Sequence, residues 1–213
     1  MTTETIDITA LPAGHPVKTY FEEKELIQKL TEELTATDPV TENQKYYNIF
    51  NQLNTIERRF ERKENQLFPF LEKRGWNGPS QGMWSFHDNL REQFKLLRKK
   101  LDDRNFEEVK ADTKFLISGL YRLLLVEETV LFPNALQILK DEDWTNVRQG
   151  EEEIGWMLTQ TPPAFPEPEY IHPSQDYTKR ELSFSLENTS HYDEGYMTVE
   201  QVNLLLKTMP LDL

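Results

Sequence analysis

The chain has 213 residues, a formal net charge of −13 and no cysteine. Its length allows one domain of ordinary size plus an appendage. Its acidity argues against nucleic-acid binding, because phosphate contacts require clustered lysine and arginine. The lack of cysteine excludes disulfides, thiolate metal sites and cysteine nucleophiles, so any metal would be held by histidine and carboxylate.

The N-terminal segment shows no sign of export. It lacks the basic region and apolar core of a secretory signal. No apolar run approaches the roughly 18 residues needed to span a membrane. We therefore expect a cytoplasmic protein that does not bind membranes.

Apolar residues recur at helical spacing along most of residues 12–158. His15-Pro16 opens the first such segment, where proline is tolerated in a first helical turn. The expected long helices cover about residues 15–36, 41–73, 81–101 and 106–135. Short loops and the lack of strand-like alternation favour an all-α, up-down-up-down four-helix bundle.

A Leu-Phe-Pro motif occurs twice, late in the second and fourth expected helices. The two copies cover residues 63–69 and 127–133, and their alignment places Glu64 over Glu128. Both glutamates fall on apolar stripes, where a carboxylate is costly unless it is paired, protonated or bound to a metal. Helical phase leaves both Glu127 and Glu128 open as the inward residue, although the alignment prefers Glu128. The prolines of the two motifs are expected to kink their helices.

An antiparallel bundle would bring the polar residues of the core stripes together. Glu23 and His87 lie early in the first and third helices, whereas Glu64 and Glu128 lie late in the second and fourth. Glu23 could equally face solvent beside Glu22. All four can therefore stand within about two turns of one bundle end, with His15 at its mouth. Histidine and carboxylate ligands on facing helices are how bundles hold non-haem metals, chiefly iron or manganese.

Several segments together resemble the hemerythrin-like HHE cation-binding family. The motifs are Gly14-His15-Pro16, residues 62–69, residues 84–88 and residues 127–133. The closer similarity is to a bacterial subgroup in which this domain precedes a PAS sensor domain, and it extends to residues 142–144, 153–156 and 195–206. The resemblance covers residues 12–158 as the domain and 194–213 as a connector.

The resemblance implies a four-helix bundle with a non-haem, often di-iron, centre that binds oxygen or senses oxygen, nitric oxide or iron. Carried over by position, the metal ligands would be His15, Glu64, His87 and Glu128, followed by Glu23 and Glu127. Lys18 and Arg59 stand where relatives commonly have histidine. These cations could neutralise the glutamates, so the site would hold one or two iron ions, manganese or zinc, or no metal at all.

The chain changes character after Leu139. Asp141-Glu142-Asp143 can cap a short helix that packs on the bundle through Trp144 and Trp156. Residues 159–213 read as a linker or arm: a proline-rich stretch, an alternating strand-like segment at 178–187, and an amphipathic helix from Thr198 to Leu206. We expect this arm to lead to a downstream PAS or other signalling domain.

Three functions are compatible with these features. The first is an iron-binding sensor module that passes its state through the arm. The second is a metal-free bundle that acts as an interaction or regulatory scaffold. The third is a redox enzyme such as a di-iron oxidase or nitric oxide reductase. The sequence has no paired Glu-x-x-His motif, so we expect a protein that is not an enzyme.

Overall fold

The computed structural model describes residues 7–167, 189–192 and 195–198. The chain divides into two compact units, Met1–Pro168 and Glu169–Leu213.

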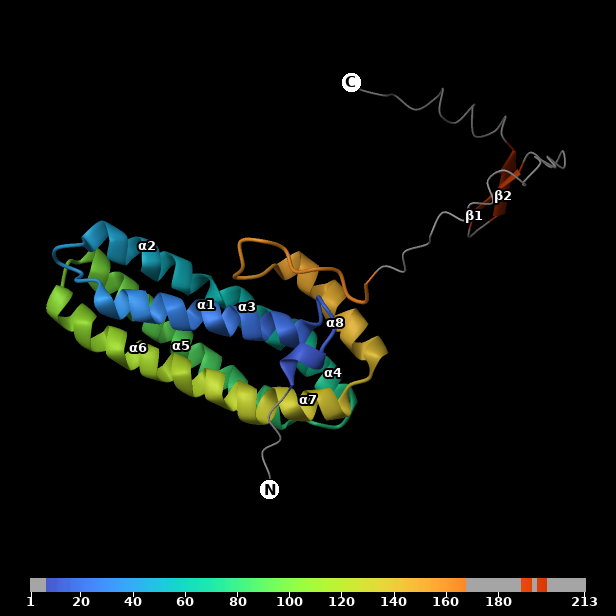
Figure 1. Cartoon of the computed structure of the whole chain (residues 1–213), viewed down its shortest axis with the longest axis horizontal. Helices are drawn as coiled ribbons and strands as arrows, with labels where there is room; N and C mark the ends of the chain where they lie inside the picture. Colours follow the sequence, from blue (N-terminus) through green and yellow to red (C-terminus); the bar gives the residue numbers. More distant parts are fainter. Residues whose placement is uncertain (1–6, 168–188, 193–194, 199–213) are drawn as a thin grey trace. The chain divides into compact units, whose positions relative to one another are not determined.

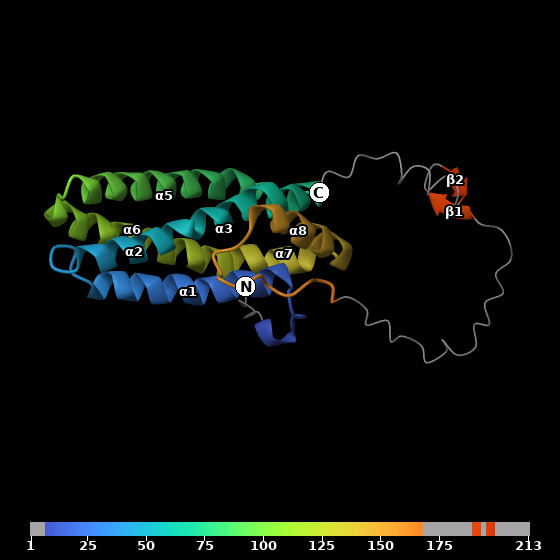
Figure 2. The same ribbon diagram turned by 90° about the horizontal axis from the view of Figure 1, so that it is seen from above.

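All secondary-structure elements described in the first unit are helices, which confirms the expected all-α class for residues 7–167. Its long helical rods lie side by side along one axis, and short loops join consecutive rods at alternating ends (Figures 1 and 2). After η1 (Ile8–Ala10), the first rod is α1 (Pro16–Ala36), and the second consists of α2 (Asn43–Leu53), η2 (Asn54–Ile56), α3 (Glu57–Arg62), η3 (Lys63–Leu67) and α4 (Phe68–Lys73). The third rod is α5 (Gly78–Asp102). The fourth rod consists of α6 (Phe106–Val126), η4 (Glu127–Leu131) and α7 (Phe132–Ile138). None of the described helices is both long and apolar enough to cross a lipid bilayer.

A further helix, α8 (Asp141–Ile154), packs against α1, α3 and η3. Its first turn is acidic, and Asp143 Oδ2 accepts a hydrogen bond from the backbone N–H of Lys140 at 3.0 Å. This carboxylate satisfies an otherwise unpaired donor at the helix start. Trp144 on α8 is buried, as the sequence predicts.

The interior of the bundle has two halves of different chemistry. Near the α1–α2 and α5–α6 loops it is apolar, with fully buried side chains such as Leu53, Leu97 and Leu116. Burial of such surface supplies most of the stabilisation of a helical bundle. Toward α8 the interior contains buried charged side chains.

Both Leu-Phe-Pro motifs fold as π turns. The N–H of Phe68 donates to the carbonyl of Lys63, and the N–H of Phe132 donates to that of Glu127, each five residues back. Pro69 and Pro133 follow immediately and have no N–H to continue the α-helical ladder. Wide turns of this kind occur frequently at functional sites in helices.

The second unit contains an antiparallel pair of strands, β1 (Thr189–Tyr192) and β2 (Gly195–Thr198). Thr189 lies opposite Thr198, and Tyr192 lies opposite Gly195. The sequence did not predict this pairing. The strand expected at 178–187 and the amphipathic helix expected to follow Thr198 lie outside the described residues.

Candidate functional site

Ionisable side chains fill the bundle interior beside the two π turns. We call this cluster the charge network; its members are Glu23, Arg59, Arg62, Lys63, Glu64, His87 and Glu127. All are buried, and the most exposed of them, Glu64, is only 7% exposed. They come from α1, α3, η3, α5 and η4, so the network ties facing helices together.

Lys63 is the hub of the network. Its ammonium group donates to Glu127 Oε1 and lies 2.8 Å from His87 Nε2. An ammonium group has no lone pair, so His87 Nε2 must accept. His87 Nδ1 then carries the hydrogen and donates to Glu64 Oε1 at 2.7 Å. One neutral tautomer of His87 therefore satisfies both contacts.

The surroundings of His87 favour that neutral form. The ring stacks on Phe60, with centroids 4.5 Å apart and planes inclined by 8°. Burial, together with the nearby Lys63 ammonium, lowers the pKa of His87 to about 4. Glu64 receives two further hydrogen bonds from Arg91, at 3.0 and 2.8 Å. The imidazole is thus uncharged at neutral pH, with both nitrogens engaged.

Two arginines extend the network toward α1. Arg59 donates to Glu127 and, at 3.1 Å, to Glu23 Oε2, which also accepts from Arg62. Arg59, Arg62 and Lys63 lie three and four residues apart, so they share one face of the same helical rod. Three cations from one rod therefore meet two carboxylates from two other rods.

The charges of the central pair persist at neutral pH. Burial alone would raise the pKa of Glu127, but Arg59 and Lys63 outweigh it and hold that pKa at about 2. Burial lowers the pKa of Lys63 to about 8, although Glu127 opposes the change. The Lys63–Glu127 contact is therefore an ion pair at pH 7.

The charge network is bonded directly to the chain that follows α8. We call residues 155–167 the exit segment. Glu23 Oε1, the oxygen not bound to arginine, accepts from the backbone N–H of Met157 at 2.9 Å. Arg148 on α8 donates to the carbonyls of Pro162 and Pro163, both at 3.1 Å. Arg58 donates to the carbonyl of Trp156 at 2.8 Å.

A second buried acid lies beside the network. Glu151 on α8 is fully buried, and its carboxylate oxygens have no hydrogen-bond partner within the described part of the chain. Burial raises the pKa of Glu151 to about 7, although Arg62 opposes this shift.

Sequence reasoning did not identify Arg62, Arg148 or Glu151. The only available signal was their helical spacing from neighbouring apolar residues.

The structure gathers four of the six predicted metal ligands, namely Glu23, Glu64, His87 and Glu127. His15 lies elsewhere: its Nδ1 accepts from the N–H of Val17 at 3.2 Å, and its ring packs on Trp144 and Phe165. The motif alignment preferred Glu128, but Glu127 is the glutamate that faces the interior.

Glu128 and Lys18 also depart from the expected arrangement. The side chain of Glu128 is 37% exposed and pairs with Lys24 at 2.5 Å. Lys18 Nζ contacts the carbonyl of Leu11 at 3.5 Å and makes no ion pair with a described glutamate. Arg59 pairs with the interior glutamates, and the other interior cations are Lys63 and Arg62.

The donor set of the network does not fit a metal ion. Both oxygens of Glu127 bind cationic side chains, and both nitrogens of His87 are engaged. Within residues 7–167, 189–192 and 195–198, no group of three or more histidine or acidic side chains is arranged to hold a metal. A metal ligand must offer a free lone pair, which lysine and arginine lack when protonated.

The fold and the site together define a class of protein: an all-helical bundle with histidine and carboxylate side chains gathered between facing helices, as in metal-binding bundles. Residues 22–135, just over half of the chain, match the family model for the hemerythrin HHE cation binding domain. The chain therefore belongs to the hemerythrin HHE family. A comparison with curated proteins finds no match.

Proposed function

We propose that this protein is a metal-independent hemerythrin-family module that serves as a regulatory or interaction scaffold. Its own cations, Arg59, Arg62 and Lys63, take the place of a bound metal ion. The observation that carries the proposal is the position of the Lys63 ammonium, between Glu127 and His87 in the buried centre.

Electrostatics supports this proposal. Unit charges 4 Å apart interact by about 4 kcal/mol at an effective dielectric constant of 20. A divalent ion among these side chains would be repelled about twice as strongly by each nearby cation. The interior carboxylates are already neutralised by arginine and lysine. A metal ion would therefore have to displace Lys63 before it could reach Glu127 or His87.

A change in the scaffold would be transmitted to the rest of the chain through the exit segment. Glu23 binds Arg59 and Arg62 through one oxygen and the backbone of Met157 through the other. A change that moves Glu23 therefore alters how the exit segment is held. We propose that the module positions the chain beyond residue 167, and that a PAS or other signalling domain is the recipient.

The second candidate is the iron-responsive sensor of oxygen or nitric oxide. The family match favours it, because the family is described as cation binding. In that case a metal-bound form would require the interior ion pairs to rearrange.

Metal analysis separates the two candidates. The full chain is purified without chelator, incubated anaerobically with ferrous iron, desalted and assayed for metal, with a di-iron hemerythrin treated in parallel as the loading control. We expect metal at background level and a melting temperature that EDTA does not change. Half an equivalent or more of iron, lost together with stability on chelation, would instead establish the metal-binding candidate.

The same treatment of a matched variant tests the electrostatic reason. In the double variant R59H/K63A, an imidazole replaces one cation and the other is removed, so Glu127 and His87 lose their competing donors. We expect this variant to retain more iron than the wild-type chain. Equal retention, at background, by a variant that circular dichroism shows to be folded would point to a cause other than the internal cations.

A further inference from the structure

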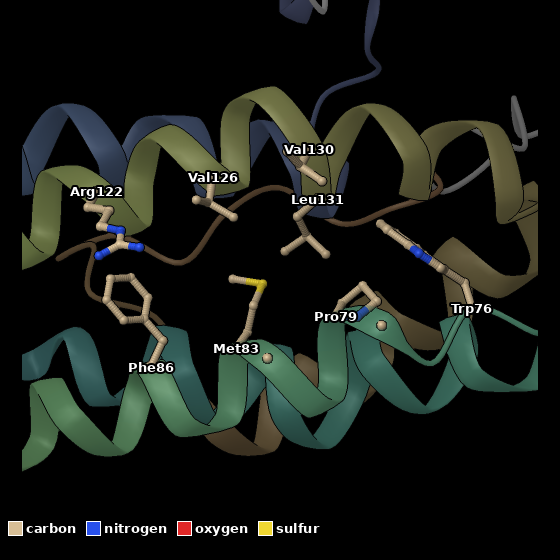
Figure 3. A pocket seen from close by; sticks show the side chains of 10 residues that line it. Trp76, Pro79, Met83, Phe86, Arg122, Val126, Val130 and Leu131 are labelled. Carbon is tan, nitrogen blue, oxygen red and sulfur yellow. The ribbon is translucent and has the colours of Figure 1, made fainter.

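An apolar groove lies on the side of the bundle where α5 faces the junction of α6 and η4. Its volume is about 510 Å³, within the range of small-molecule sites. Figure 3 shows Trp76 at one end and Arg122 at the other. The walls between them are formed by Pro79, Met83, Phe86, Val126 and Val130.

The groove is elongated. Pro79, Met83 and Phe86 follow one another at helical spacing along α5. At 1.5 Å of rise per residue, this wall extends about 10 Å. Val126 and Val130, four residues apart, form the facing wall. An extended apolar chain can lie along this wall.

Arg122 supplies the single charged group of the lining. Its guanidinium lies 5.7 Å from the centroid of the Phe86 ring. Among the residues that the structure describes, it makes no ion pair, in contrast to Arg59, Arg62 and Arg91. Guanidinium groups recognise carboxylates through two parallel hydrogen bonds. The groove therefore combines an apolar channel with one anion-binding end.

We propose that this groove binds a fatty acid, with the hydrocarbon chain between α5 and the α6–η4 junction and the carboxylate on Arg122. The site lies outside the charge network and uses none of its residues, so it does not depend on whether the network binds metal. Val130, which is 47% exposed, would be covered by the bound chain.

Gly82 provides a variant that blocks the groove and preserves the fold. It lines the groove within α5, and a Cβ placed there meets no atom within 4 Å. In G82L the added side chain occupies the channel. Replacing a glycine inside a helix also favours the helix, so loss of binding would not reflect unfolding.

The test titrates the full chain with dodecanoate below its critical micelle concentration, and follows tryptophan fluorescence and calorimetric heat. We expect saturable binding near one equivalent that is abolished in G82L. R122Q should weaken dodecanoate binding about tenfold, which is the affinity that one charge-assisted hydrogen bond contributes. R104Q, which removes an exposed arginine of the α5–α6 loop, should bind like the wild type. Dodecyltrimethylammonium, with the same tail and a cationic head, should not bind.

Each contrary result overturns a defined part of the proposal. No saturable dodecanoate binding, or binding unchanged in G82L, removes the groove as the site. Binding lost in G82L but unchanged in R122Q, or equal binding of the cationic amphiphile, removes the carboxylate assignment.

Discussion

Lys63 and Glu127 occupy equivalent positions in the two Leu-Phe-Pro motifs, and their side chains bind each other in the bundle interior. Each residue opens a π turn. The next residues, Glu64 and Glu128, are also equivalent, and each binds a basic side chain closer to solvent. One sequence motif thus supplies both the cation and the anion of a buried pair.

Removing the lysine should strongly destabilise the bundle. In K63M, Glu127 and His87 each lose a buried donor. Breaking a buried ion pair on one side typically costs about 3–5 kcal/mol. The double variant K63M/E127L should recover part of that loss, because it removes both charges of the pair, although Arg59 also loses its contact with Glu127. Urea unfolding of the single and double variants measures both effects.

Lys24 provides the matched control for this experiment. It pairs with Glu128, the half-exposed neighbour of Glu127. Solvent-exposed pairs contribute only about 0–1 kcal/mol, so K24M should unfold nearly like the wild type. If K63M and K24M lower the free energy of unfolding by the same amount, the interior pair has no special role in stability.

The pH dependence of stability should steepen when Glu151 is made neutral. In the folded state the pKa of Glu151 is raised to about 7, from about 4.5 in the unfolded chain. Glu151 therefore contributes to the free energy of unfolding below pH 4.5, and this contribution is lost as pH rises through 7. The pKa values of His15 and His87 are lowered to about 4. The stabilisation that these two histidines contribute is present above pH 6.5 and is lost as pH falls through 4.

These two effects oppose each other between about pH 4.5 and 6.5. In E151Q only the histidine effect remains, so the free energy of unfolding should fall more steeply on acidification, by up to about 1.4 kcal/mol per pH unit. Denaturant unfolding at several pH values checks the slope, with E152Q, an exposed neighbour on α8, as the control. An unchanged slope in E151Q would mean that Glu151 titrates normally in the folded state.

Replacing Gly14 should release the exit segment. Gly14 has a φ of 72°, and a Cβ there would stand 2.2 Å from the carbonyl oxygen of Pro163. In G14A the exit segment must therefore move, which should accelerate hydrogen exchange at the Met157 amide and proteolysis of residues 155–167.

The control variant G75A distinguishes the effect of this clash from the effect of backbone strain. The φ of Gly75 is also positive, at 87°, but a Cβ there would meet nothing within 4 Å. G75A should lose about 1 kcal/mol from strain alone and leave exchange at Met157 unchanged. Equal acceleration in both variants would show that strain, rather than contact with Pro163, controls the exit segment.

Two helical glycines should respond oppositely to alanine. Gly82 in α5 has open space around its Cβ position, so G82A should stabilise the bundle by about 0.4–1 kcal/mol. Gly119 in α6 faces Leu90, whose Cδ2 would lie 2.9 Å from the new Cβ. G119A should lose that gain or become destabilising, because the buried Leu90 side chain would have to shift. Thermal melts of the two variants provide the comparison, and a gain in both would mean that the contact with Leu90 relaxes freely.

The sequence carried clear signals for the helices and for the two special turns. Apolar spacing located all four long helical rods, because a 3.6-residue period sustained over many turns has no strand counterpart. The repeated Leu-Phe-Pro motif marked the turns that became π turns. Helical phase also placed Glu64 and His87 on inward faces, where the structure has them buried, whereas it left Glu23 open between the interior and solvent.

Only the tertiary structure decided which charges pair in the interior. Adjacent helical positions differ by about 100°, so phase could not choose between Glu127 and Glu128 when both neighboured apolar stripes. Lysine and arginine are normally found in solvent, and only carboxylates reaching in from other helices make their burial tolerable. The helical segments follow from local periodicity in the sequence, whereas the pairing of Lys63 with Glu127 depends on how separate helices pack, because each charge is stable in the interior only beside the other.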